Sequence, residues 1–306
     1  MQHDLKLNIL GCGSATPSRR HLPACQVLEH NGQLLMIDCG EGAQRSMMMH
    51  GLPFTRLRHI FISHLHGDHF LGLPGLLSTL SLHDCGGSIV VHTFKQGAEI
   101  LQQMMDVFCH DTSFAIEYDI IKPERAVIYE DHALTVETVA LSHRVPAVGF
   151  IFREKPKERH IIPDMIAFHQ VPVSRIRAIK QGADFVKDDG TVIANERLTR
   201  PADPAMSYAY CSDTMYDPSL AEALRGVDTI YHESTYLDED EQKARERGHS
   251  TARQAARIAA AAGARRLILG HYSQRYDSEE PFAAEAATEF GGEIIAAREG
   301  MKIDLL

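Results

Sequence analysis

At 306 residues the chain is long enough for one large core or two modest domains. Its formal net charge of −10 argues against a protein coated in basic surface for nucleic acid, although a local basic patch is compatible with it. Hydrophobic residues make up 44% of the chain, yet no apolar run is long enough to cross a bilayer, so we expect no membrane association.

The cysteines and the N-terminal segment bear on the compartment. The six cysteines are scattered without a Cys-x-x-Cys pair, which is typical of reduced, mostly buried thiols. The first ten residues, MQHDLKLNIL, lack the basic stretch and apolar run of an export signal. Together these features predict a cytoplasmic protein.

Strand-like apolar segments alternate with helix-like segments along the chain. We expect strands at 5–10, 33–39, 59–63, 88–93, 133–141, 147–152, 207–212, 228–234 and 265–270, and helices at 71–82, 97–108 and 250–263. In the last helix Ser250 or Thr251 can cap the start, and Gly263 can supply the left-handed residue at the end. Mixed elements over the whole length indicate a layered α/β protein.

The segment from Arg153 to Lys180 departs from this pattern. It holds three prolines and seven Lys/Arg against three acids, a local surplus of four positive charges. Two interpretations stay open for it: a solvated surface excursion, or a contact surface for phosphates.

A dense group of metal-ligand side chains follows the predicted strand at 59–63, in SHLHGDH. On an extended strand residues two apart face the same side, so His64 and His66 can reach one ion. Gly67 lets the backbone turn and brings Asp68 and His69 toward a second position. Imidazoles with a carboxylate suit zinc, and manganese or iron as the carboxylate content rises.

Three more ligand-type side chains follow hydrophobic runs elsewhere in the chain: His143, Asp213 and His271. Strand ends in α/β folds share one rim, and sites form there. The resulting seven ligands are enough for two metal ions, with Asp213 as the carboxylate that both ions share.

These motifs carry a resemblance. SHLHGDH, followed by a lone His, a lone Asp and a late His, resembles the metallo-β-lactamase superfamily, whose fold is a four-layer αββα sandwich. Within it the chain resembles the short form of ribonuclease Z over nearly its whole length, in LGCGSATP, MIDCGEGAQ, YHESTY, GHSTARQAA and LGHYSQRY. The resemblance implies a single domain over 1–306, a homodimer, and a zinc-dependent endoribonuclease. Such an enzyme cuts precursor tRNA after the discriminator nucleotide, leaving a 3′-hydroxyl on the tRNA and a 5′-phosphate on the trailer.

The resemblance also implies roles for individual residues. The family pattern places two Zn²⁺ per subunit, with Mn²⁺ or another divalent ion as an alternative. One ion is held by His64, His66 and His143, the other by Asp68, His69 and His271, and Asp213 is shared. Asp68 is placed to orient or deprotonate the attacking water.

Two residues outside the metal set prompt a hypothesis about proton transfer. We expect His249 to be the general acid, with Glu233 holding its imidazole in the useful tautomer. The alternative is that His249 is only a helix-entry residue before Ser250. Asp38 is expected to support the metal site through hydrogen bonds without being a ligand.

Substrate contacts are expected in two places. The segment 153–180 corresponds in position to the arm that grips tRNA in this family, although VPVSRIRAIK replaces the usual Gly-Pro-rich stretch. Lys155, Lys157 and Arg159 are the expected phosphate contacts there. The N-terminal loop TPSRRHLPA keeps a basic Arg19 but lacks the family's Arg-Asn pair.

Two alternatives belong to other functional classes. One is a different dinuclear hydrolase of this fold, acting on small phosphodiesters or thioesters, which would have little use for the arm. The other is an RNA-binding protein without catalysis, and the complete ligand set argues against it.

Overall fold

The computed structural model describes residues 5–83 and 85–306. Residues 1–4, at the start of the segment inspected for an export signal, lie outside this range. The chain divides into two compact units, one made of Met1–Glu130, Thr135–Arg153 and Met206–Leu306 and the other of Asp131–Leu134 and Glu154–Ala205. Within the described ranges no helix combines the length and the apolar character needed to cross a membrane.

The first unit contains two seven-stranded sheets. The first sheet has the order β18-β1-β2-β3-β4-β5-β6, in which β3, β4, β5 and β6 run parallel and β18, β1, β2 and β3 pair antiparallel. Its strands are β1 (Lys6–Gly11), β2 (Cys25–His30), β3 (Gln33–Ile37), β4 (Leu57–Phe61), β5 (Ser88–Thr93), β6 (Ala115–Ile120) and β18 (Lys302–Asp304).

The second sheet has the order β17-β16-β15-β14-β9-β8-β7. Strands β14 to β17 run parallel to one another, and β9 pairs antiparallel to β14. Its strands are β7 (Val127–Glu130), β8 (Leu134–Leu141), β9 (Ala147–Glu154), β14 (Ser207–Cys211), β15 (Thr229–Glu233), β16 (Arg266–Gly270) and β17 (Glu293–Ala296).

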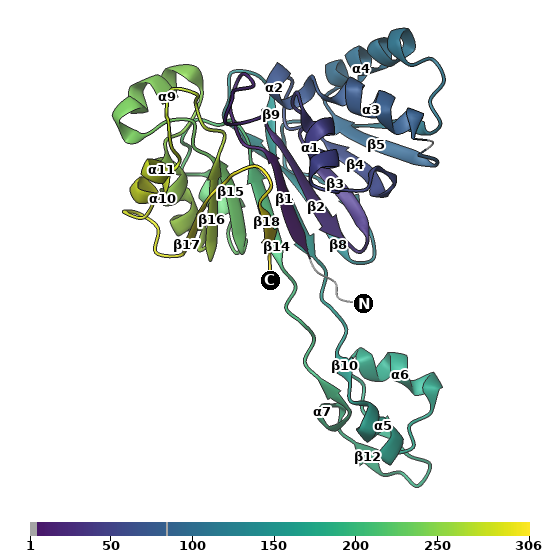
Figure 1. Ribbon diagram of the computed structural model, residues 1–306. Helices are drawn as coiled ribbons and strands as arrows, with labels where there is room; N and C mark the ends of the chain where they lie inside the picture. The colour runs from purple at the N-terminus through teal and green to yellow at the C-terminus, as the bar shows by residue number, and fades with distance from the viewer. Residues whose placement is uncertain (1–4, 84) are drawn as a thin grey trace. The chain divides into compact units, whose positions relative to one another are not determined.

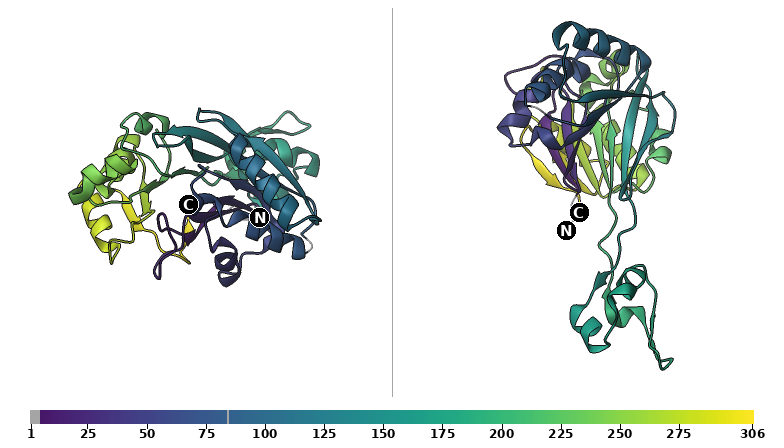
Figure 2. Two further views of the ribbon diagram at one scale, coloured as in Figure 1. Left: turned by 90° about the horizontal axis from the view of Figure 1, so that it is seen from above. Right: turned by 90° about the vertical axis from the view of Figure 1, so that its right-hand side faces the viewer.

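Helices cover the outer face of each sheet, which gives four layers (Figures 1 and 2). The first sheet is covered by α1 (Ala43–Met49), α3 (Leu73–Leu82) and α4 (Lys95–Phe108), and the second by α10 (Ala252–Ala262) and α11 (Glu280–Ala286). Helix α8 (Leu220–Ala223) packs against α10. The shorter helices of this unit are α2 (Gly67–Phe70), α9 (Glu241–Arg247), η1 (Phe54–Arg56) and η2 (Asp238–Asp240). The αββα sandwich expected from the sequence is therefore confirmed.

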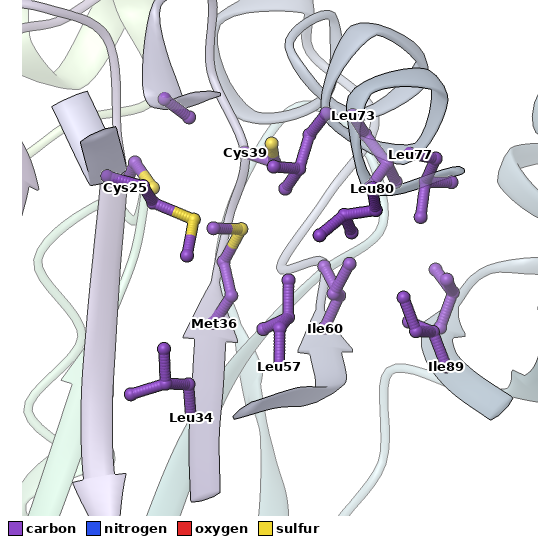
Figure 3. Close-up of a cluster of buried hydrophobic side chains, with 14 of the residues drawn as sticks. Cys25, Leu34, Met36, Cys39, Leu57, Ile60, Leu73, Leu77, Leu80 and Ile89 are labelled. Atoms are coloured by element: carbon purple, nitrogen blue, oxygen red, sulfur yellow. The ribbon is translucent and has the colours of Figure 1, made fainter. Parts of the chain in front are cut away.

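Apolar side chains fill the space between these layers. Leu73, Leu77 and Leu80 recur at helical spacing on α3 and pack against β3 and β4 of the first sheet (Figure 3). Between the two sheets the rings of Phe61 and Phe152 meet edge to face, with centroids 5.5 Å apart. Strand β14 is buried on both faces, and its sequence SYAYC reads as a nearly continuous apolar and aromatic run.

The predicted elements are all present. Each of the nine predicted strands and three predicted helices occurs, with ends displaced by at most two residues. Of the two possible caps on α10, Thr251 is the one used: it forms a capping box with Gln254, and Gly263 ends the helix at φ 74°.

The second unit has a small core of its own. Its elements are α5 (Pro163–Phe168), α6 (Val173–Lys180), α7 (Asn195–Leu198), a β10–β13 pair (His160–Ile161 and Thr199–Arg200) and a β11–β12 pair (Phe185–Val186 and Val192–Ile193). Ile179, Phe185 and Leu198 are buried together, and the Asn195 amide donates to the carbonyls of Ile179 and Ala183. Residues 154–180 of the cationic segment belong to this unit, which continues to Ala205.

Candidate metal centre

Strand ends of both sheets deliver the seven predicted ligands to one edge of the sandwich. β14 ends two residues before Asp213, β16 ends one residue before His271, and β8 ends two residues before His143. Because β14 and β16 run parallel within one sheet, their carboxyl ends lie at the same edge.

The backbone that carries His64 and His66 differs from the prediction. Strand β4 ends at Phe61, so both histidines lie in the loop that follows it. The Ser63 N–H donates to the carboxylate of Asp38 at 2.7 Å, where a strand would donate to a neighbouring carbonyl. The turn at Gly67 is the start of helix α2, closed by the Leu71 N–H on the Gly67 carbonyl. The idea of an extended strand with a glycine turn was therefore wrong, although the side chains still converge.

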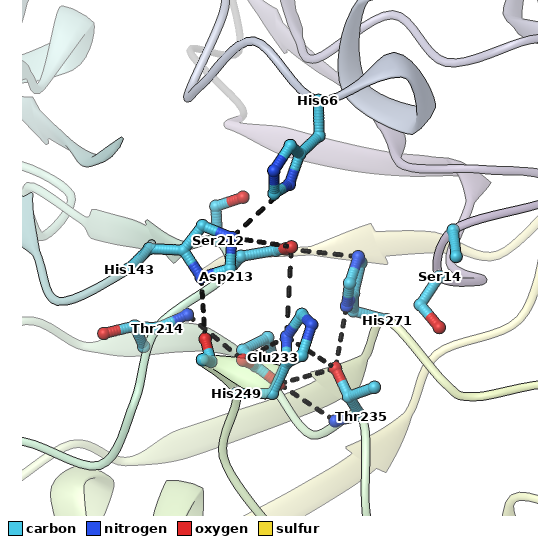
Figure 4. Close-up of polar contacts among 12 residues, drawn as sticks. Ser14, His66, His143, Ser212, Asp213, Thr214, Glu233, Thr235, His249 and His271 are labelled. Atoms are coloured by element: carbon cyan, nitrogen blue, oxygen red, sulfur yellow. Dashed lines mark hydrogen bonds and ion pairs between the residues drawn. The ribbon is translucent and has the colours of Figure 1, made fainter. Parts of the chain in front are cut away.

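The first ligand group consists of His64, His66, His143 and Asp213, whose ligand atoms all lie within 4.8 Å of one another. His64 Nε2 is 3.1 Å from His66 Nδ1. His143 Nε2 is 3.4 Å from the same His66 atom (Figure 4). Burial lowers the pKa of all three imidazoles. They are therefore neutral at pH 7, the form that binds a metal ion.

The second ligand group consists of Asp68, His69 and His271. The Nε2 atoms of the two histidines are 3.3 Å apart, and each lies 3.5 Å from Asp68 Oδ2. Burial by itself lowers the pKa of His69, but the carboxylates of Asp213, Asp38 and Asp68 outweigh it and raise the pKa. This side of the site is thus strongly attractive to positive charge.

Asp213 faces both groups. Its Oδ2 lies 3.5 Å from His64 Nε2, and its Oδ1 lies 3.1 Å from His271 Nε2. Oδ1 is buried and accepts no hydrogen bond from any residue in the described ranges. A buried carboxylate oxygen without a donor, among imidazole nitrogens that face one another, is the arrangement that divalent cations satisfy. The residues present therefore fit a pair of such ions.

A layer of hydrogen bonds fixes the orientation of the histidines. His143 Nδ1 donates to the Gly248 carbonyl at 2.7 Å, and His271 Nδ1 donates to Thr235 Oγ1 at 2.8 Å. With Nδ1 protonated, Nε2 keeps its lone pair for a metal. Asp38 is fully buried and accepts from His69 Nδ1 at 2.7 Å, as the sequence predicted for a supporting carboxylate.

His249 and Glu233 form a pair beside the ligands. His249 Nδ1 lies 3.0 Å from Glu233 Oε1, and the fully buried Glu233 also accepts from the N–H groups of Thr214 and Ser250. Burial opposes protonation of His249, but Glu233 outweighs it and raises the pKa of His249 to about 9. Thr251 caps helix α10, so His249 is not the cap residue.

Several of these side chains border a cavity of about 410 Å³. Its lining includes His66, Asp68, Asp213, His249 and His271. An anionic group that entered the cavity would meet both ligand groups and His249 together.

One contact at the site has no signal in the sequence. The Ala15 N–H donates to Asp68 Oδ2 at 2.7 Å, and Ala15 has the left-handed φ of 62°. The loop that presents it is held by His21, whose Nε2 lies 2.9 Å from Glu279 and whose Nδ1 lies 3.0 Å from Glu299. We call Cys12, His21, Glu279 and Glu299 the loop cluster. Glu279 and Glu299 lie more than 250 positions beyond His21, so no local pattern reveals the pairing.

The four residues predicted to contact RNA lie on the N-terminal loop and in the second unit. Arg19 is exposed on the N-terminal loop. In the second unit Lys157 Nζ pairs with Glu154 at 2.8 Å, and Arg159 Nε donates to Thr199 at 2.7 Å. Lys155 is half-buried in the same unit.

Comparisons with known proteins agree with this geometry. The family described as "Anti-Pycsar protein Apyc1" matches residues 5–155, and the "Beta-lactamase superfamily domain" matches residues 197–272. The ribonuclease Z of Parabacteroides distasonis is 47% identical, with 99% of each chain covered, and that of Bacteroides fragilis is 47% identical over 98% of this chain and 99% of the relative. The crystal structure of the short form of human tRNase Z matches with a TM-score of 0.72 and 25% identity, over 98% of this chain and 99% of the human chain. On this evidence the chain belongs to the ribonuclease Z family.

Proposed function

We propose that the protein is an endoribonuclease that removes the 3′ trailer from precursor tRNA by hydrolysis after the discriminator nucleotide. The observation that carries this proposal is the pair of ligand groups that both face Asp213, beside a cavity that is also lined by His249, the partner of Glu233. Relatives named ribonuclease Z over the full chain, and the fold match to human tRNase Z, support the choice of substrate.

The proposal assigns two Zn²⁺ ions to the two ligand groups. His64, His66 and His143 would hold one ion, Asp68, His69 and His271 the other, and Asp213 both. The nitrogen-rich donor set favours zinc, and the two aspartates also allow manganese. When bound, ions at these positions supply positive charge that polarises the phosphodiester and activates water.

The chain's own residues carry out the proton transfers. In the proposed reaction water attacks phosphorus, and the bond from phosphorus to the 3′ oxygen of the tRNA breaks. His249 gives a proton to that departing oxygen, while Glu233 fixes the imidazole through its 3.0 Å contact with Nδ1. Asp68 orients the attacking water and accepts its proton, and the Ala15 N–H holds the Asp68 carboxylate in place.

The second unit is the proposed tRNA-binding arm. It carries nine Lys/Arg and nine Asp/Glu and is therefore neutral, so the whole net charge of −10 lies on the first unit. RNA thus meets less repulsion at this unit than at the rest of the surface. Lys155, Lys157 and Arg159 in this unit, and Arg19 in the first, are the proposed phosphate contacts.

The proposal includes a cytoplasmic homodimer. Light scattering after size-exclusion chromatography measures the assembly directly. A mass near 34.1 kDa at working concentration would contradict the dimer.

One assay separates this function from its alternatives. The purified protein is incubated with a tRNA bearing a 3′ trailer, and in parallel with a small phosphodiester and a thioester. We expect cleavage of the tRNA, with a 3′-hydroxyl on the tRNA and a 5′-phosphate on the trailer. Preference for a small ester, or a zinc content below one ion per chain after careful preparation, would overturn the proposal.

A further inference from the structure

Two exposed arginines stand on the rim of the metal-site cavity without a role in the proposed reaction. Arg144 directly follows the ligand His143, and Arg247 is the last residue of helix α9. Neither side chain forms an ion pair or a hydrogen bond with another residue in the ranges 5–83 and 85–306. Their guanidinium groups are therefore available to a ligand.

Arg245 also forms no side-chain pair within the described residues, but it does not line this cavity. Two other arginines are paired. Arg275 pairs with Asp240 at 3.1 Å, and Arg298 pairs with Glu279 at 2.9 Å. In a chain with 41 acidic and 31 basic residues, carboxylates are in excess. Two unpaired guanidinium groups beside one cavity thus indicate a place for an anion that the chain does not itself supply.

The fold brings the two arginines to one side of the cavity. His143 Nδ1 donates to the Gly248 carbonyl at 2.7 Å, which fastens the loop of Arg144 to the end of α9. A Cβ at Gly248 would lie 2.9 Å from His143 Nδ1 and 3.2 Å from Arg144 Cγ, and Gly248 has φ 82°. Only glycine fits there, and its absent side chain leaves room for the stem of Arg144.

Arg144 lies beside the reacting part of the site. It lines the same cavity as His66, Asp213 and His249. His66 and His249 lie on opposite sides of Asp213 (Figure 4). The guanidinium is therefore close to the place where a phosphodiester would be cut, without being part of either ligand group.

A purely structural role accounts for Arg247 only in part. A cation in the last turn of a helix interacts favourably with the helix dipole. Arg245 occupies the same last turn of α9 and supplies that charge as well. The dipole does not explain why Arg247 lines the cavity.

We propose that Arg144 and Arg247 bind the phosphate next to the scissile phosphate in the RNA strand. This proposal rests on the proposed function, and it adds a second binding point for the RNA strand beside the metal ligands. A guanidinium fork matches two phosphate oxygens at once, which fixes the direction of the strand as well as its charge.

The test pairs each arginine with one phosphate. Trailer-bearing tRNAs are made with a neutral methylphosphonate linkage on the 5′ side or on the 3′ side of the cut. Arg144→Ala, Arg247→Ala and the control Arg245→Ala are assayed on these RNAs and on the all-phosphate RNA. The melting temperature of each variant shows that it is folded.

On the all-phosphate RNA we expect KM to rise about tenfold for Arg144→Ala and for Arg247→Ala. The slope of log KM against log salt concentration should fall by about 0.7 for each variant. On the RNA that carries the neutral methylphosphonate at the position bound by the arginines, the two substitutions should raise KM little further. Arg245→Ala should leave KM unchanged on every RNA, and Arg144→Lys should recover part of the loss.

The results that would overturn the subsite are distinct from those that would overturn the function. Equal losses on neutral and charged linkages at both positions, or an equal loss in Arg245→Ala, would remove the subsite alone. If the unmodified protein does not cut the trailer, the proposed function falls and the subsite falls with it.

Discussion

Two clusters of ligand-type side chains lie in the first unit, and they differ in how their polar atoms are satisfied. In the loop cluster both nitrogens of His21 face carboxylates, and Arg20 and Arg298 pair with Glu279. In the metal centre imidazole nitrogens face one another as well as the carboxylates of Asp68 and Asp213. Asp213 Oδ1 accepts no hydrogen bond in the part of the chain that the structure describes. Both hold groups of three or more possible ligands. Unsatisfied polar atoms, and not ligand composition, therefore distinguish a site for a cation from an internal ion pair.

The largest expected effect comes from removing the carboxylate that faces both ligand groups, and it tests whether the two clusters differ. Asp213→Ala takes a ligand from both groups, so we expect loss of bound metal and a fall in the single-turnover rate of about 1,000-fold or more. Metal analysis and quenched-flow cleavage measure the two effects. Glu299→Gln is the matched control from the loop cluster and should keep its metal. Equal metal loss in both variants would show that the clusters do not differ as described.

The second prediction, on His249, separates proton transfer from metal binding. His249→Ala should lower kcat about 100- to 10,000-fold, because the leaving oxygen then departs without a proton donor. Metal content should stay at the parental value, since His249 belongs to neither proposed ligand set. A turnover rate near that of the parent, with normal metal content, would show that His249 is not the general acid.

A smaller effect, a loss of stability that depends on pH, is expected when His21 of the loop cluster is replaced. Burial lowers the pKa of His21, but Glu299 and Glu279 outweigh it and raise the pKa above 6.5. Because the folded-state pKa is the higher one, the ion pairs stabilise the protein fully below pH 6.5, and this stability is lost as the pH rises through the folded value. His21→Gln should lower the free energy of unfolding by about 1–3 kcal/mol in acidic solution.

Urea unfolding of the parent and of His21→Gln across pH 5.5 to 9 tests this sign. The difference between the two proteins should shrink as the pH rises. The groups that face His21 are Cys12, Glu279 and Glu299, and Arg20 and Arg298 complete the network. Parallel stability curves over the whole range would mean that His21 is not held as a cation.

The smallest effect should come from Cys12. Its thiol is buried, donates to the Ala297 carbonyl and lies 3.4 Å from His21 Nδ1. Cys12→Ser keeps a donor at this position, so we expect a loss of stability of about 1 kcal/mol and an unchanged metal content. A metal content lowered by one ion per chain would show that the loop cluster is a metal site after all.

The sequence predicts those parts of the fold that are strongly apolar. Helix α3 has leucines at helical spacing, and β14 and β16 are largely apolar runs. These elements could therefore be found, together with the ligands that follow the two strands. Strands β6 and β7 were not predicted, because AIEYDI and VIYE are partly exposed, contain acidic residues and lie at sheet edges. The paths of the loops could not be predicted, for a different reason. The Ser63 N–H bonds the Asp38 carboxylate in place of a strand carbonyl, and the Ala15 N–H bonds Asp68. Both are contacts between distant segments that form only on folding.

Asp38 joins parts of the molecule that fold from separate stretches of sequence. Its carboxylate follows β3 of the first sheet, accepts the Tyr210 hydroxyl of β14 in the second sheet at 2.8 Å, and accepts His69 Nδ1 at 2.7 Å. A cation bound at His69 would polarise the same imidazole and so strengthen its bond to Asp38. Loss of that cation would therefore weaken a contact that joins the two sheets of the sandwich.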